Sequence, residues 1–246
     1  MAEQLALVTG GLRGLGRAMA FGLARQGHPV VAVGHIAGDA AEIEAEAAGL
    51  QLRDRLCPLV ADLRETAECD RVVAETRARF GAIDILVNNA GLTFTYIDPP
   101  RFRRPTIQRF FEVGDEIIDN VITTNYLAAD RLSRRVAPAM IAKGWGRIVN
   151  VTTKLDTMNR TGTHPYGASK AAEIALAESL GRELASLKIR VNTVSPGSIL
   201  FEGGSWAKRS KEMPEKIAEF VSREFPWGRM GTLDEVADVV TFMLSP

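Results

Sequence analysis

Short apolar runs alternate along the chain with longer stretches in which apolar residues recur at helical spacing. The short runs are rich in Val, Ile and Leu and do not alternate cleanly between apolar and polar positions. Strands of this kind are buried on both faces, as in a parallel sheet covered by helices. The pattern predicts an α/β fold with one doubly wound, Rossmann-type parallel sheet and right-handed crossovers. The predicted strands are Leu5–Thr9, 29–33, a run that ends at 59–61, 83–87, 148–151 and Ile189–Val194, and the predicted helices are 14–26, 39–48, 65–80 and 234–244.

Two stretches, 92–111 and 195–214, interrupt this pattern with clustered prolines or glycines. Long irregular segments in a compact domain are commonly lids or binding loops. The sequence contains no internal repeat and no low-complexity linker. We therefore expect one catalytic domain over residues 1–246.

Composition narrows the class of protein. The formal net charge is zero, whereas nucleic-acid-binding domains carry a basic surplus. Cys57 and Cys69 form neither a Cys-x-x-Cys pair nor a zinc-ligand spacing, so we expect no metal site and a reducing compartment. The N-terminus has no signal-peptide pattern, and no apolar run approaches the ~20 residues that span a bilayer. We expect a cytoplasmic enzyme that binds neither nucleic acid nor membrane.

A glycine-rich turn joins the first predicted strand to the first predicted helix. Gly10, Gly14 and Gly16 stand where a dinucleotide site needs a tight turn, a close backbone approach to the pyrophosphate, and close packing of helix on strand. The helix N-terminus adds amide donors and a partial positive charge for the phosphates. The spacing is T-G-x-x-x-G-x-G, and it predicts a nucleotide cofactor.

Four further motifs follow in order: Asp62-Leu63 after the third strand, Asn88-Asn89-Ala90-Gly91 after the fourth, Tyr166-x-x-x-Lys170, and Ser195-Pro196-Gly197 after the sixth. With these motifs the chain resembles the short-chain dehydrogenase/reductase family from Leu5 to Ser245. The resemblance implies an oxidoreductase that moves a hydride between a nicotinamide cofactor and a carbonyl or alcohol carbon. It places the cofactor on Gly10, Arg13, Gly14, Leu15, Gly16, His35, Asp62, Leu63, Asn89, Ala90, Gly91, Tyr166, Lys170, Pro196, Gly197 and Ile199.

The end of the second strand indicates which cofactor is preferred. NAD sites usually carry an acid there, which binds the ribose 2′-hydroxyl. Here Gly34 stands at that position, so no carboxylate repels a 2′-phosphate. Arg13 lies within the glycine turn, and His35 adds a donor. We expect NADP(H) in preference to NAD(H).

Tyr166 and Lys170 are four residues apart, which places both side chains on one face of a helix. The reference pKa of tyrosine is about 10, and a neighbouring ammonium lowers it. We expect Lys170 to lower the pKa of Tyr166 in this way. Tyr166 would then be the general acid in reduction and the general base in oxidation.

The resemblance implies two further catalytic residues. The family has a serine thirteen residues before the tyrosine, and Thr153 stands there. A threonine hydroxyl has the same donor and acceptor capacity, although its side chain is stiffer. Thr152 would face the other way on a strand. Asn125 matches the family's asparagine, which anchors a proton-relaying water.

The stretches 144–150 and 192–197 resemble those of 3-oxoacyl-thioester reductases, so a 3-oxoacyl or related ketone is the expected substrate. Two alternatives stay open: an NAD-dependent sugar or polyol dehydrogenase, and a cofactor-binding protein without turnover. The resemblance also implies a homo-oligomer, a tetramer or a dimer. Relatives continue past Ser245 with one more strand, so we expect the last edge strand to be absent.

Side chains in the two irregular stretches leave their roles open. Arg101, Arg103, Arg104 and Arg109 either form an anion-binding lid or belong to a solvated loop or subunit contact. Phe201 stands where many relatives have a threonine that binds the carboxamide. Trp206 either closes over the substrate or packs its own loop.

Overall fold

Six parallel strands form the centre of the protein. The computed structural model describes residues 3–101, 103 and 106–245. The strands lie in the order β3-β2-β1-β4-β5-β6, and every neighbouring pair is parallel. This confirms the predicted doubly wound sheet. The strands are β1 (Leu5–Thr9), β2 (Val30–Gly34), β3 (Leu56–Val60), β4 (Ile83–Asn88), β5 (Gly146–Val151) and β6 (Ile189–Val194).

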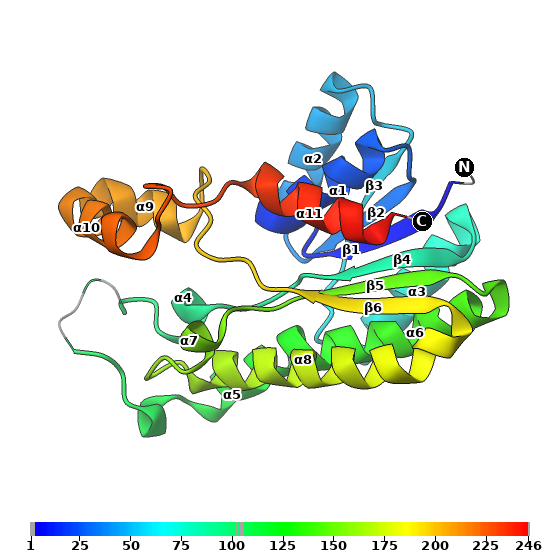
Figure 1. The fold of residues 1–246 in the computed structure, drawn as a ribbon. Helices are drawn as coiled ribbons and strands as arrows, with labels where there is room; N and C mark the ends of the chain where they lie inside the picture. The colour runs from blue at the N-terminus through cyan, green and yellow to red at the C-terminus, as the bar shows by residue number, and fades with distance from the viewer. Residues whose placement is uncertain (1–2, 102, 104–105, 246) are drawn as a thin grey trace.

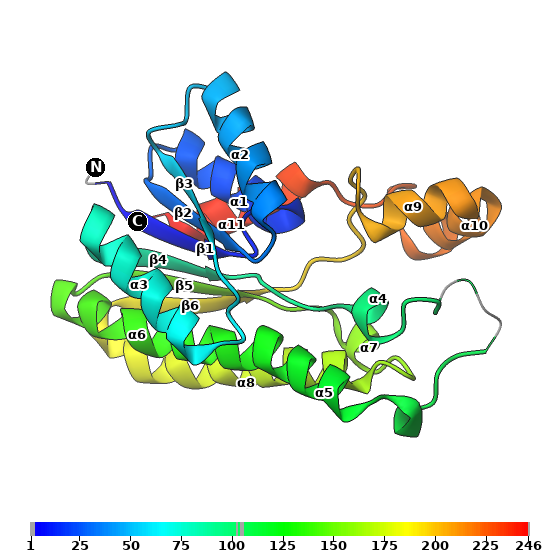
Figure 2. The same ribbon diagram turned by 180° about the vertical axis from the view of Figure 1, so that it is seen from behind.

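Helices cover both faces of the sheet, which explains why the strands carry apolar side chains on both sides (Figure 1). The view from behind shows the same two layers (Figure 2). One apolar core lies under the first layer and a second under the other. The first layer holds α1 (Gly14–Arg25), α2 (Ala37–Gly49) and α11 (Leu233–Leu244), and the second holds α3 (Thr66–Phe80), α6 (Ala128–Lys143) and α8 (His164–Leu184).

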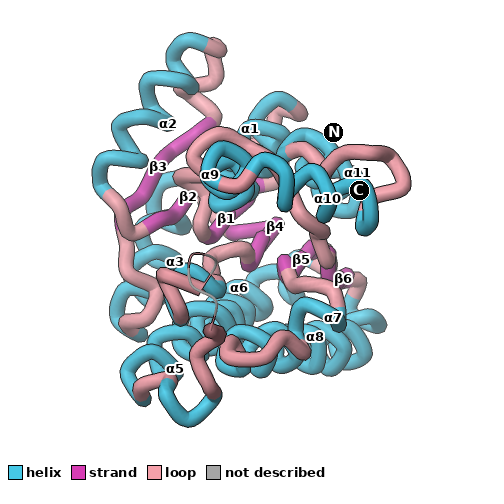
Figure 3. The backbone as a smooth tube through the Cα atoms, turned by 90° about the vertical axis from the view of Figure 1, so that its left-hand side faces the viewer, coloured by secondary structure: helices cyan, strands magenta, loops and turns pink. Residues whose placement is uncertain are grey.

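The carboxyl ends of the strands face the viewer in Figure 3. The strand order reverses between β1 and β4, and ligands of such sheets bind outside the carboxyl ends at this switch point. Short elements gather beyond this edge. They are α4 (Phe94–Ile97), η1 (Phe110–Glu112), α7 (Leu155–Met158), α9 (Ser205–Glu212) and α10 (Pro214–Glu224).

The predicted strands and helices agree with the structure to within a few residues at their ends. The expectation of an irregular stretch over 195–214 is wrong for its second half, which forms α9 and begins α10. The reason is tertiary packing: the Trp206 ring of α9 stacks on Phe220 of α10 at 4.9 Å between centroids. Within the described residues, every helix is too short or too polar to cross a membrane.

Candidate active site

The turn between β1 and α1 has the shape of a phosphate cradle. Gly10 and Gly14 have φ of 61° and 53°, a conformation in which other residues are strained. A Cβ on Gly16 would lie 2.0 Å from the Gly10 carbonyl oxygen, so the helix touches the turn. The N-cap residue Arg13 makes no side-chain capping bond. The first amides of α1, from Leu15 onward, are therefore available to an anion.

Asn89 fixes the end of β4 against this turn. Its Nδ2 atom donates to the Thr9 carbonyl oxygen at 3.0 Å. The Thr9 hydroxyl in turn accepts from the amides of Asn89 and Ala90 at 2.9 and 3.0 Å. A Cβ on Gly91 would lie 3.7 Å from the Lys170 Nζ atom. The segment after β4 thus spans from the glycine turn to the lysine.

The far end of the predicted cofactor site has no carboxylate at the end of β2. A Cβ on Gly34 would lie 2.9 Å from the Leu12 side chain, so close packing favours glycine there. The Arg13 side chain is 62% exposed and only loosely paired with Asp39, at 3.9 Å. His35, which follows Gly34 in the sequence, is also exposed. Both side chains are accessible to a charged ligand.

Asp62 is hydrogen-bonded to Arg64, a residue that the sequence did not indicate as part of the site. The backbone amide and the guanidinium of Arg64 donate to its carboxylate, the latter at 2.6 Å from Nη2. These hydrogen bonds lower the pKa of Asp62, although partial burial opposes them. Leu63 beside it is buried. A ligand at this position therefore meets a fixed carboxylate that already has a partner.

Thr153, Tyr166 and Lys170 come together where β5 ends and α8 begins, and all are buried. The Thr153 side chain lies beside the Tyr166 phenol and acts to lower its pKa. The Thr152 hydroxyl instead lies 2.7 Å from that of Ser195. The chain just after β5 therefore turns Thr153, not Thr152, toward the tyrosine.

The pKa of Tyr166 differs from expectation. Burial raises it to about 12, the hydrogen bond from Thr153 opposes this rise, and the charge of Glu173 adds to it. The expected lowering by Lys170 is not found, because the Lys170 ammonium is engaged elsewhere. Its Nζ atom lies 2.6 Å from Glu173 Oε2 and donates to the Val151 carbonyl oxygen at 2.7 Å.

Asn125 lies in a π-helical segment, η2 (Thr123–Leu127), which joins α5 (Asp115–Ile122) to α6. Such bulges are frequent at functional sites. Its Nδ2 atom donates to the Leu92 carbonyl oxygen at 3.1 Å and to the Ser169 hydroxyl at 2.9 Å, and its Oδ1 atom accepts from the Leu92 amide at 2.7 Å. The side chain thus ties α8 to the segment after β4.

The segment after β6 returns toward the glycine turn. It runs through Pro196 and Gly197 to Ile199, which is buried and forms a parallel bridge with Gly231. A Cβ on Gly14 would lie 3.3 Å from the ring of Phe201. Phe201 therefore lies over the N-terminus of α1, a contact that the sequence alone did not indicate.

The two irregular stretches are joined to one another. Arg103 pairs with Glu212 of α9 at 3.0 Å. Arg101 donates to the Thr161 carbonyl oxygen at 2.8 Å, and Arg104 lies outside the described residues. The Arg209 guanidinium lies 4.1 Å from the centroid of the Trp206 ring. With its stacking on Phe220, Trp206 packs α9 against α10, which is the second of the two roles considered for it.

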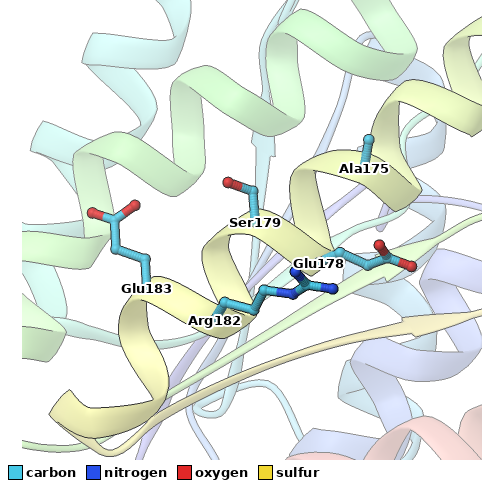
Figure 4. A pocket seen from close by; sticks show the side chains of 5 residues that line it. All are labelled: Ala175, Glu178, Ser179, Arg182 and Glu183. Atoms are coloured by element: carbon cyan, nitrogen blue, oxygen red, sulfur yellow. The ribbon is translucent and has the colours of Figure 1, made fainter.

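Two surface cavities are lined in part by α8. One, of about 860 Å³, is lined on α8 by Gly167, Ala168 and Ala171, on the side of the helix opposite Tyr166. The other, of about 580 Å³, is lined only by α8 side chains such as Glu178 and Arg182 (Figure 4). Neither is lined by Thr153, Tyr166 or Lys170. In the described part of the chain, no cluster of three or more His, Cys, Asp or Glu residues is suited to a metal ion.

Residues 4–212 match the family described as short chain dehydrogenase. The chain belongs to this family. The predicted enzyme class, an oxidoreductase of the short-chain dehydrogenase/reductase type, is thereby confirmed.

Similar proteins cover almost the whole chain. The 3-oxoacyl-(acyl-carrier-protein) reductase FabG of Escherichia coli strain K12 is 34% identical over 98% of this chain and 90% of its own length. Nodulation protein G of Azospirillum brasilense is 30% identical over 100% of this chain and 92% of its own. Among solved structures, a variant of actinorhodin polyketide ketoreductase with NADPH matches with a TM-score of 0.84 and 28% identity, over 99% of this chain and 91% of its own.

Two residues that were not predicted from the sequence, Phe94 and Glu173, lie close to the predicted site residues. The Phe94 ring of α4 meets the Tyr166 ring edge-on, with 4.8 Å between centroids. Glu173 contacts the dehydrogenase motif's lysine, Lys170. Helical spacing carried a signal for Glu173, because it lies three residues after Lys170 and seven after Tyr166. Phe94 had no such signal, because only the folded loop brings it to Tyr166.

Proposed function

We propose that this protein is an NADP(H)-dependent ketone reductase that forms a secondary alcohol from a 3-oxoacyl-type substrate. The observation that carries the proposal is the grouping of three buried residues, Thr153, Tyr166 and Lys170, at the same sheet edge as the glycine turn. The names of the relatives, 3-oxoacyl reductases and a ketoreductase solved with NADPH, support the same class.

The state of Tyr166 suits the reduction. With a pKa raised to about 12, the phenol keeps its proton at neutral pH and can donate it to a carbonyl oxygen. The Thr153 hydroxyl, which lies beside the phenol, would orient the same oxygen. When bound, the reduced nicotinamide supplies the hydride to the carbonyl carbon. The proton on the product oxygen thus comes from Tyr166, which bulk solvent must then reprotonate.

The cofactor would be held along the sheet edge. The free amides at the start of α1 fit the pyrophosphate, and Gly91 fits a ribose near Lys170. The exposed Arg13 and the absence of an acid at Gly34 favour a 2′-phosphate, hence NADP(H). The full proposed set is Gly10, Arg13, Gly14, Leu15, Gly16, His35, Asp62, Leu63, Asn89, Ala90, Gly91, Tyr166, Lys170, Pro196, Gly197 and Ile199.

The surroundings of Tyr166 favour an apolar acyl substrate over a polyol. Tyr166 belongs to a buried apolar cluster with Ile97, Val113 and Val121, and Phe94 packs against this cluster. A sugar or polyol site would need several polar groups to hydrogen-bond the hydroxyls. The NAD-dependent sugar or polyol dehydrogenase is therefore the second candidate, and it becomes an outcome of the test.

The proposal also covers the oligomeric state and the cellular compartment. We infer a homo-oligomer, a dimer or a tetramer, which light scattering of the purified protein would test. Cys57 and Cys69 are free thiols, which fits a reducing compartment such as the cytoplasm. The partner is a small carbonyl or alcohol compound.

The deciding experiment compares NADPH and NADH oxidation across a panel of 3-oxoacyl thioesters, 3-oxoacyl esters and simple ketones. We expect turnover with NADPH in preference to NADH, and loss of turnover in Tyr166→Phe with cofactor binding intact. Tyr96→Phe is the matched control and should retain activity. Turnover confined to NADH and polyols would favour the second candidate. Tight NADPH binding without turnover of any compound would favour a non-catalytic protein.

A further inference from the structure

Helix α8 carries a buried carboxylate one turn after the lysine. Glu173 is 1% exposed, and its Oε2 atom lies 2.6 Å from Nζ of Lys170. Tyr166, Lys170 and Glu173 are spaced by four and three residues, so they share the face of α8 that is turned toward the sheet. Glu178 and Glu183, on the same helix, are exposed to solvent (Figure 4).

Stability alone does not account for this ion pair. Removing a carboxylate from water is costly, and the attraction of one partner often fails to compensate for that cost. Apart from the contact with Lys170, no described residue donates a hydrogen bond to either carboxylate oxygen of Glu173. An apolar side chain would fill the same space between helix and sheet at lower cost. The carboxylate therefore points to a role in the site rather than in packing.

The contacts of Lys170 show what Glu173 controls. A lysine ammonium has three N–H donors. Val151 accepts from it at 2.7 Å, and Glu173 lies at 2.6 Å. These two contacts fix Nζ beside Gly91, where an added Cβ would be 3.7 Å away. Glu173 thus both positions the ammonium and offsets its charge.

The groups around the pair are uncharged. From β5, Asn150 donates to the Glu173 carbonyl oxygen at 3.3 Å, and Val151 offers only its backbone. From η2, Asn125 is bonded to Ser169. Among the described residues, the charge that acts on Glu173 is that of Lys170, and the charge that acts on Tyr166 is that of Glu173. Charged residues of α5, α7 and β6 shift the pKa of neither group.

The charge of Glu173 acts on the phenol in a definite direction. A carboxylate near a phenol disfavours the phenolate, and the pKa of Tyr166 is raised in part by Glu173. Burial raises the pKa of Glu173 itself to about 7, although Lys170 opposes this rise. The ionisation of Glu173 therefore falls in the pH range in which an enzyme of this class works.

We infer that Glu173 is a positioning residue that holds Lys170 and neutralises its charge, so that Tyr166 keeps its proton and the site favours reduction over oxidation. This inference rests on the proposed function for its catalytic meaning, but its electrostatic part concerns only Tyr166, Lys170 and Glu173. Loss of the carboxylate removes a negative charge that disfavours the phenolate of Tyr166.

The test is ultraviolet titration of Tyr166 in the protein without cofactor or substrate. The phenolate of Tyr166 is isolated as the difference between each protein and its Tyr166→Phe counterpart. At about pH 10, where an unperturbed tyrosine is half ionised, the wild type should show almost no phenolate at this position. Glu173→Gln and Glu173→Leu should both show more phenolate than the wild type. Glu178→Gln, an exposed glutamate on the same helix, is the matched control and should behave as the wild type.

Equal ionisation of Tyr166 in the wild type and in both neutral variants would overturn the inference. Glu173→Asp keeps the charge and should retain the protonated phenol, which a purely structural role would not predict. With an active substrate, kcat for reduction divided by kcat for oxidation at neutral pH should fall by up to about tenfold in Glu173→Gln for each unit by which the tyrosine pKa drops. If no ketone is reduced but the titration shifts, the proposed function fails and the electrostatic role stands.

A measurement on the unaltered protein covers the case in which the neutral variants do not fold. Carbon NMR of the labelled wild type should show the Glu173 carboxyl titrating well above the other glutamates, with the Tyr166 ring carbons responding at the same pH. Separate, uncoupled titrations of the two groups would overturn the inference.

Discussion

At the scale of single residues, the chemistry of the site depends on the proton of Tyr166. Burial raises the pKa of Tyr166 and so disfavours loss of the proton. The Thr153 side chain opposes this rise, and the charge of Glu173 adds to it. Lys170 does not act alone, because Val151 and Glu173 engage its ammonium. The reactivity of the tyrosine is therefore set by a group of neighbours.

This balance predicts different pH dependences for the two directions. Reduction needs the phenol, which is present at all pH values well below about 12, so its rate should be nearly constant between roughly pH 7 and 9. Oxidation needs the phenolate, whose fraction rises about tenfold per pH unit below the pKa, so its rate should rise over the same range. Initial rates at saturating cofactor measure both. An oxidation rate that levels off near neutral pH would contradict the raised pKa.

The hydroxyl at position 153 gives a second prediction. Thr153→Ala removes the hydrogen bond to Tyr166 and the expected contact with the carbonyl oxygen, so kcat/KM should fall by roughly 10- to 100-fold, as for loss of one to two hydrogen bonds to a reacting group. Thr153→Ser keeps the hydroxyl and should match or exceed the wild type. Thr152→Ala serves as the neighbouring control. Full activity in Thr153→Ala would remove the orienting role.

At the scale of elements, the site is built where segments return to the carboxyl edge of the sheet. Asn89 and Thr9 join the ends of β4 and β1, and Asn125 joins η2 to α8. The loop after β6 is tied down at Ile199 by its bridge to Gly231 before it reaches α9. These segments are thus anchored to a strand, a helix or another loop.

The position of Phe201 is expected to affect how tightly the cofactor binds. Its ring lies over Gly14 at the N-terminus of α1, where phosphates are expected. A ring that must move before the ligand binds reduces the apparent affinity. Phe201→Ala should therefore bind NADPH more tightly. Calorimetry measures this, with the exposed Phe242→Ala as control. Weaker binding would show that Phe201 instead contacts the bound cofactor.

At the scale of the whole molecule, one sheet with apolar cores on both faces supports the site. Leu86 lies in β4 near the centre of the sheet, is fully buried, and pairs in register with Leu7 and Ile148. The Arg147 side chain, also on the sheet, packs over Trp145 at 4.3 Å. Rigid packing of this kind keeps the strand ends, and so the site residues, in fixed relative positions.

This architecture predicts a large stability effect at Leu86. Leu86→Ala should lower the free energy of unfolding by about 2–5 kcal/mol, because it leaves a cavity that the central strand cannot collapse. Denaturant unfolding followed by circular dichroism measures the loss. Leu155→Ala, at a side chain that is 68% exposed, should change stability by no more than about 0.5 kcal/mol. Similar effects at the two positions would contradict the assigned core.

The sequence by itself determined the sheet, its helices and the positions of the main motifs. The strands are short and mostly apolar, so the pattern identified the elements, and glycine and Tyr-x-x-x-Lys spacings are local properties of a turn and a helix. The sequence also indicated Thr153, because its thirteen-residue distance from Tyr166 bridges two predicted elements. The roles of these residues, and the single domain, stay predictions.

Only the tertiary structure decided how distant residues modify those motifs. Glu173 is close in sequence to Lys170, but only burial against β5 turns it from an ordinary helix glutamate into a partner of the lysine. Phe201 reaches Gly14, and Trp206 stacks on Phe220, through loop and helix packing that no local pattern encodes. The pKa of Tyr166 rose where spacing alone predicted a fall, because desolvation and the direction of an ammonium depend on the three-dimensional surroundings.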